Sequence, residues 1–145
     1  MYERFEEASR EVVILAQEEA RRLGKSRIGT EFILLALIGQ ETGLASRILK
    51  SLGANVTEVR SKVEQLTAFS PGTSNNEIFR YSPTAERAVI ESSKKALQLK
   101  SNLICTEHLL LALIEEQESV AVKVLMDLGI SPEQVRIKVY ETLND

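Results

Sequence analysis

The sequence predicts an all-α protein: eight helices, arranged as two pseudo-twofold-related four-helix repeats packed into one globular domain. Three observations support this prediction. The 145 residues are 43% hydrophobic but only 5% aromatic, without tryptophan, and a core of Leu, Ile, Val and Ala favours helices over sheets. Apolar residues recur at helical spacing, and no strand pattern is evident. The second half of the chain repeats the first.

The repeat is clearest in two phrases, TEFILLALIGQ at residues 30–40 and TEHLLLALIEE at residues 106–116. A shift of 76 positions brings them into register. Between Thr30–Val63 and Thr106–Val139, 15 of 34 aligned pairs are identical. The identities include Thr-Glu and Leu-Gly pairs as well as apolar positions, so two merely similar amphipathic helices do not explain them.

The repeat sets the expected domain organisation. One domain covers residues 1–145, with repeat one at 1–67, a linker at 68–80 and repeat two at 81–145. The stretch AFSPGTSNNEIF, residues 68–79, is rich in Pro, Gly, Ser and Asn. This composition predicts an exposed segment without regular structure.

In repeat one, the first helix follows apolar spacing from Ala8 to Leu23, and Gly24 can end it in a left-handed conformation. Thr30 is placed to cap the second helix, with Glu31 in the first turn, where the helix dipole favours an acid. The segment 32–38 is apolar on nearly every side, so this helix should be central and buried.

The remaining helices are predicted from their end signals. Gly43 begins the third helix and Gly53 stops it, and Asn55 or Thr57 caps the fourth. Repeat two follows the same order. Its expected helix starts are Ser82-Pro83, Thr106, Ser119 and Ser131-Pro132.

Composition narrows the class of function. The net charge of −3 comes from 18 basic and 21 acidic residues that are well mixed, so we expect no polyanion-binding surface. The single Cys105 cannot form an internal disulfide, which suits a reducing compartment. The start MYERFEEASR lacks an apolar signal core, and no window approaches the roughly 18 apolar residues of a membrane helix. We expect a soluble, intracellular protein, and the sequence is also compatible with the earlier removal of a transit peptide.

Catalytic motifs are absent from the sequence. It contains neither G-x-x-x-x-G-K-[ST] nor G-x-G-x-x-G, so this chain alone should neither bind nor hydrolyse ATP. Cys105 and His108 are close enough in sequence to suggest a Cys-His nucleophile or a metal pair. No third ligand or orienting residue accompanies them, and His108 aligns with Phe32 of the first repeat, which favours a packing role. We expect no enzyme activity, cofactor or metal.

A helix-turn-helix DNA-binding regulator is the alternative from a different class. The stretch LGISPEQVR, residues 128–136, has a suitable helix-Gly-turn-helix pattern. The cations that follow, Arg136 and Lys138, are offset by Glu133 and Glu141, which leaves little charge for phosphate contacts. Its repeat partner LGANVTEVR has the same form, so the pattern belongs to the repeat. We expect no nucleic-acid binding.

The whole chain resembles the N-terminal domain of the Clp chaperone ATPases, and is most similar to the ClpC type. The stretches that carry this resemblance are MYERFEEAS, LAQEEARRLGKSRIGTEFILLAL, IFRYSPTAERAVIESS, TEHLLLALI and VLMDLGISPEQVR. The resemblance implies a non-catalytic protein-binding module, either the N-domain of an ATPase or a stand-alone accessory. Its implied partners are adaptor proteins, protein substrates and Clp ATPase or peptidase subunits, and the isolated domain should be monomeric.

The resemblance also implies two pockets for phosphorylated arginine, one at each Thr-Glu phrase. Their glutamates would be Glu31 beside Thr30 and Glu107 beside Thr106. A carboxylate can bind the guanidinium bidentately, and helix N–H groups with a nearby hydroxyl can bind the phosphate. The alternative is that both glutamates only complement the dipoles of their helices.

Departures from the family pattern make the two sites unequal. Glu6 replaces the hydroxyl residue of the first helix and should repel phosphate, whereas Ser82 keeps a hydroxyl in the fifth helix. Cys105 replaces the glycine that is retained as Gly29. Assigning Glu6 to the first site, we expect the surviving pocket to be the second, built from Ser82, Thr106 and Glu107.

Overall fold

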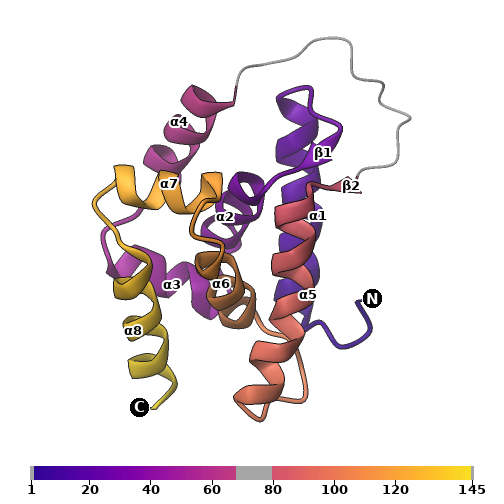
Figure 1. Ribbon diagram of the computed structural model, residues 1–145, viewed down its shortest axis with the longest axis vertical. Helices are drawn as coiled ribbons and strands as arrows, with labels where there is room; N and C mark the ends of the chain where they lie inside the picture. Colours follow the sequence, from indigo (N-terminus) through magenta and orange to yellow (C-terminus); the bar gives the residue numbers. More distant parts are fainter. Residues whose placement is uncertain (1, 68–79, 145) are drawn as a thin grey trace.

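A computed structural model describes residues 2–67 and 80–144. The predicted linker therefore lies outside the described residues, except for Arg80, which is part of a short strand. The elements in chain order are α1 (Glu7–Arg22), β1 (Arg27–Ile28), α2 (Thr30–Gly39), α3 (Leu44–Ser51), α4 (Val56–Leu66), β2 (Arg80–Tyr81), α5 (Pro83–Gln98), α6 (Thr106–Glu115), α7 (Val120–Asp127) and α8 (Pro132–Leu143). The predicted eight-helix, all-α architecture is confirmed for these parts of the chain (Figure 1).

The sequence repeat is also a structural repeat. Shifting α1, α2 and α3 by 76 positions gives the bounds of α5, α6 and α7, and α8 extends one residue beyond the shifted α4. The matching lengths arise although the capping residues differ, for example Gly43 before α3 and Ser119 before α7.

Helices α2 and α6 form the centre of the molecule, as their apolar sequences predict (Figure 1). Every residue of 32–38 and of 108–114 is buried. One apolar cluster runs through both halves. The third helix of each repeat crosses over: α7 packs on α2 and α4, and α3 packs on α6 and α8. The two repeats therefore share one core.

Most helix-end predictions are confirmed. Ser82, Ser119 and Ser131 are N-caps whose hydroxyls accept backbone N–H groups, and Pro83 and Pro132 occupy the first turns of their helices. Gly43 precedes α3, and Asn55 rather than Thr57 caps α4. Gly24 and Gly53 have positive φ values of 73° and 101°.

The predicted capping role of Thr30 and Thr106 is wrong. The N-caps of α2 and α6 are Gly29 and Cys105, and each threonine is buried at the interface between the repeats. Thr30 Oγ1 accepts the Ala121 amide of α7, and Thr106 Oγ1 accepts the Ala45 amide of α3, both at 3.1 Å. Each threonine thus caps a helix of the other repeat.

Two short parallel pairings were missed by the sequence analysis. Strand β1 pairs with β2, with Ile28 opposite Tyr81, and an isolated bridge joins Phe5 to Ile104. The repeat relates these pairings to each other, since Phe5 corresponds to Tyr81 and Ile104 to Ile28. At two residues per strand, alternation is too short to be recognised in a sequence.

Among the described residues, no individual helix has the length and apolar content of a membrane span. Helices α2 and α3 meet those criteria only when they are taken together, and their axes are bent by 92° at the break between them.

Candidate functional site

The first helix of each repeat begins beside the Thr-Glu phrase of the other repeat. Ser82 donates its backbone N–H to the Ile28 carbonyl at 2.9 Å, which places the start of α5 beside α2. Symmetrically, Glu6 donates its backbone N–H to the Ile104 carbonyl at 3.0 Å, which places the start of α1 beside α6.

The predicted composition of the two sites is therefore corrected. Ser82 lines a pocket with Thr30 and Glu31, not with Thr106 and Glu107. Glu6 lies beside Cys105, with 3.5 Å between its Oε2 and the cysteine Sγ. The error arose because the sequence places Glu6 and Glu31 in one repeat, whereas the parallel pairing joins each first helix to the opposite repeat.

The pocket at Glu31 has a volume of about 560 Å³. Three helices begin at its wall: α2 after Gly29, α5 after Ser82 and α7 after Ser119. The first N–H groups of a helix have no partner within the helix, and the helix dipole makes this end electropositive. The hydroxyls of Ser82, Ser119 and Thr30 already accept some of these N–H groups. The dipoles of the three helices still make this pocket favourable for an anionic group.

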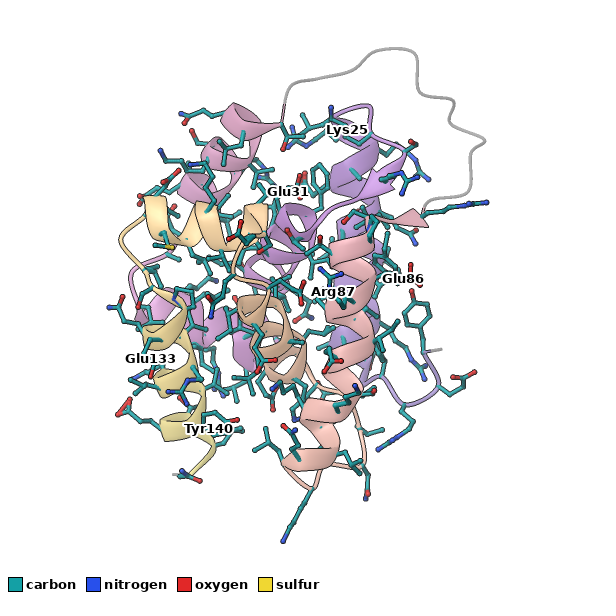
Figure 2. The ribbon with its side chains drawn as sticks, in the orientation of Figure 1. Lys25, Glu31, Glu86, Arg87, Glu133 and Tyr140 are labelled. Carbon is teal, nitrogen blue, oxygen red and sulfur yellow. The ribbon has the colours of Figure 1, made fainter. Side chains whose placement is uncertain are left out.

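Charged side chains of both signs surround the same pocket. Its lining includes the acids Glu31 and Glu118 and the bases Lys25 and Arg27. Figure 2 shows Glu31 in the upper middle of the molecule, with Lys25 above it. Carboxylates can receive a cation while helix ends and basic side chains receive an anion. The lining therefore suits a ligand that carries both charges.

Gly29 gives the Glu31 carboxylate its position. A Cβ atom built on Gly29 would lie 2.2 Å from Glu31 Oε1 and 2.8 Å from its carboxyl carbon. The carboxylate thus folds back over the helix start and uses the space of the missing side chain. On its other side, Thr67 Oγ1 donates to Glu31 Oε2 at 3.3 Å.

The equivalent region of repeat two is different. Cys105 replaces the glycine, and Glu6, at the position equivalent to Ser82, adds a carboxylate to that of Glu107. Burial, followed by the charges of Glu107 and Glu6, raises the pKa of the Cys105 thiol to about 12. Burial and then Glu6 raise the pKa of Glu107. Crowded acids and a filled glycine position make this site unfavourable for a phosphate.

Cys105 and His108 do not form a nucleophilic pair. His108 Nδ1 accepts the Cys105 backbone N–H at 2.8 Å, so the imidazole caps its own helix. Burial lowers the pKa of His108, which keeps the ring neutral at pH 7, and the thiol is protonated. Within the described residues, no three His, Cys, Asp or Glu side chains are grouped as metal ligands would be.

The candidate DNA-reading helix is α8. Val135 and Val139 bury one side of it in the core, and Arg136 is paired with Glu133 one turn earlier. Of the two cations considered for phosphate contacts, Arg136 is therefore paired within its own helix.

The fold is that of a double four-helix domain, and its distinctive site lies where three helix starts meet beside Glu31. The family model for the Clp repeat (R) N-terminal domain matches residues 4–128 and 80–145. This chain belongs to that family.

Curated relatives match over all 145 residues. A protein of Guillardia theta named ATP-dependent Clp protease ATP-binding subunit ClpA homolog is 47% identical, and the chloroplastic chaperone protein ClpC of Pisum sativum is 45% identical. The chain covers 18% and 16% of their respective lengths.

Solved structures show the same fold at low sequence identity. The N-terminal domain of ClpD from Arabidopsis thaliana superposes with a TM-score of 0.83 at 22% identity, covering 100% of this chain and 97% of that one. A ClpV N-domain in complex with a VipB peptide gives 0.70 at 16% identity, covering 91% and 82%.

Proposed function

We propose that this domain receives adaptor proteins or protein substrates for a ClpC-type unfoldase, and that the Glu31 pocket binds arginine residues phosphorylated on the guanidinium. The observation that carries the proposal is the meeting of the Glu31 carboxylate with the starts of α2, α5 and α7 in a single pocket. Family membership supports the receiving role, and the ClpV N-domain provides a relative in complex with a peptide.

The pocket offers complementary groups for both parts of such a side chain. Glu31 would bind the guanidinium, because a carboxylate and a guanidinium match in shape and charge. The helix starts at Gly29 and Ser82 would bind the phosphate, and Arg27 lies in the same lining. Binding needs no cofactor, and the domain itself performs no reaction.

The relatives suggest the setting of this module. They are named as ATP-binding subunits and chaperones and are several times longer than this chain. On this basis, ATP hydrolysis would belong to other parts of a longer protein or to a partner ring. The relatives named as chloroplastic favour the plastid stroma, with the bacterial cytoplasm as the other compartment.

A titration of the ¹⁵N-labelled domain with phosphoarginine tests the pocket. Amide shifts are expected at residues 29–32, 82–84 and 118–120, and not at 105–108. Glu31→Gln should weaken binding about 10- to 100-fold, since a hydrogen bond to a charged group contributes about 1.5–3 kcal/mol. Arginine and inorganic phosphate, titrated separately, should each bind far more weakly than phosphoarginine.

The second site provides a matched test. The double variant Glu6→Thr with Cys105→Gly removes a carboxylate and restores the glycine, so new shifts should arise at residues 105–108. Shifts confined to 105–108 in the unmodified protein would contradict the assignment. No shifts anywhere would favour the alternative in which both glutamates only complement helix dipoles.

A further inference from the structure

The Glu31 pocket has an apolar edge that phosphoarginine alone does not explain. Leu66, the last residue of α4, and Val120, the first residue of α7, both line it. Their side chains are 40% and 37% exposed. Helices α4 and α7 pack against each other, and buried Phe32 contributes to the same wall.

This edge adjoins the charged part of the pocket. Thr67 follows Leu66 directly, and its hydroxyl is hydrogen-bonded to the Glu31 carboxylate. The pocket volume of about 560 Å³ is in the range that holds ligands larger than one side chain. Leu66 and Val120 therefore line the same pocket as the Glu31 carboxylate.

We propose that the pocket binds a phosphorylated arginine together with an adjacent large apolar residue of the same peptide, which packs on Leu66 and Val120. This inference rests on the proposed function and specifies its substrate class: marked arginines in apolar sequence. Covering the two exposed side chains removes apolar surface from water, which stabilises the complex. Such segments are normally buried in folded proteins, so the preference would select unfolded chains.

The positions related to Leu66 and Val120 by the repeat supply a control. Leu66 and Val120 correspond to Thr142 and Leu44, which line a separate pocket of about 330 Å³ between α3 and α8. That pocket has a threonine in place of Leu66 and adds the cations Arg47 and Lys138. Leu44 is the first residue of α3, as Val120 is the first residue of α7, but Leu44 does not line the Glu31 pocket.

Two synthetic peptides test the inference by calorimetry: acetyl-Gly-Leu-phosphoArg-Leu-Gly-amide and the same peptide with both leucines replaced by serine. The leucine peptide should bind the unmodified domain about five- to tenfold more tightly, as expected for partial burial of a leucine. Leu66→Ser and Val120→Ser should each reduce that ratio below about twofold. Leu44→Ser should behave like the unmodified domain.

The outcomes separate the two proposals. If both peptides bind equally and Glu31→Gln weakens both, the apolar subsite is wrong and the proposed function stands. If neither peptide binds, the proposed function fails and the inference fails with it. Equal binding of an unphosphorylated leucine peptide would also overturn the inference, because the apolar edge would then act without the mark. Thermal unfolding of Leu66→Ser and of Val120→Ser shows whether any loss of peptide affinity comes from misfolding.

Discussion

At the scale of single residues, the starts of α2 and α6 differ in the space and charge beside their glutamates. Gly29 leaves space for the Glu31 carboxylate, whereas Cys105 fills the equivalent position beside Glu107 and faces Glu6. The sequence alone identified these residues, and it also predicted that Glu6 would oppose phosphate. It could not assign Glu6 and Ser82 to the correct sites, because the pairing of Ile28 with Tyr81 is a contact between repeats.

Gly29→Ala tests the role of that space. With φ at −82°, the backbone accepts alanine, but the new Cβ would displace the flexible end of Glu31. Phosphoarginine binding should weaken about tenfold or more, as for loss of a charged hydrogen bond, while the melting temperature changes little. The same substitution at Gly39, where an added Cβ meets nothing within 4 Å, is the control. Unchanged affinity in Gly29→Ala would show that the Glu31 position is not set by this glycine.

His108 predicts a pH dependence of stability. Burial lowers the pKa of His108 below the ordinary histidine value of about 6.5. Below about pH 6.5, the unfolded chain therefore binds this proton more readily than the folded chain. Unfolding free energy is therefore lost as the pH falls through that value. In His108→Phe, which copies Phe32, the loss between pH 7.5 and 5.5 should be smaller than in the unmodified protein. Urea unfolding at both pH values measures the difference, and equal losses would contradict the role assigned to burial.

At the scale of elements, the two repeats use equivalent connections with different side chains. Glu11 accepts a hydrogen bond from Gln40, and at the equivalent positions Arg87 pairs with Glu116. Lys100, which corresponds to Gly24, has a φ of 59°. Helix boundaries were predictable because serine, proline and glycine act locally. The left-handed conformation of Lys100 was not predictable, because no glycine marks the end of α5 in the sequence.

Lys100→Gly should stabilise the domain. A side chain in the left-handed region costs roughly 1 kcal/mol, and glycine relieves this strain at the end of α5, although its greater freedom in the unfolded chain offsets part of the gain. We expect an increase of about 0.5 kcal/mol in the free energy of unfolding, measured with urea. Gly24→Ala is the matched reverse change and should destabilise by about 1 kcal/mol. A loss of stability in Lys100→Gly would show that the lysine side chain contributes more than the strain costs.

At the scale of the whole molecule, each repeat contributes helix starts and capping side chains to the other repeat. Thr30 caps α7, Thr106 caps α3, and the first helix of each repeat begins beside the second helix of the other. The repeat and the apolar faces of α2 and α6 predicted a shared core. The exchange was not predictable, because self-alignment relates equivalent residues and says nothing about which of them meet in space.

The exchange predicts that the two repeats unfold together. Leu35 and Leu111 are each 2% exposed, within the common core. Replacing either by alanine should lower the free energy of unfolding by about 2–5 kcal/mol through cavity formation, a large share of total domain stability. Amide signals of α3 and α7 followed in a urea titration should disappear at one common midpoint in both variants, because each of these helices is capped and packed by the opposite repeat. Two separated midpoints, with only the mutated repeat affected, would contradict the shared core.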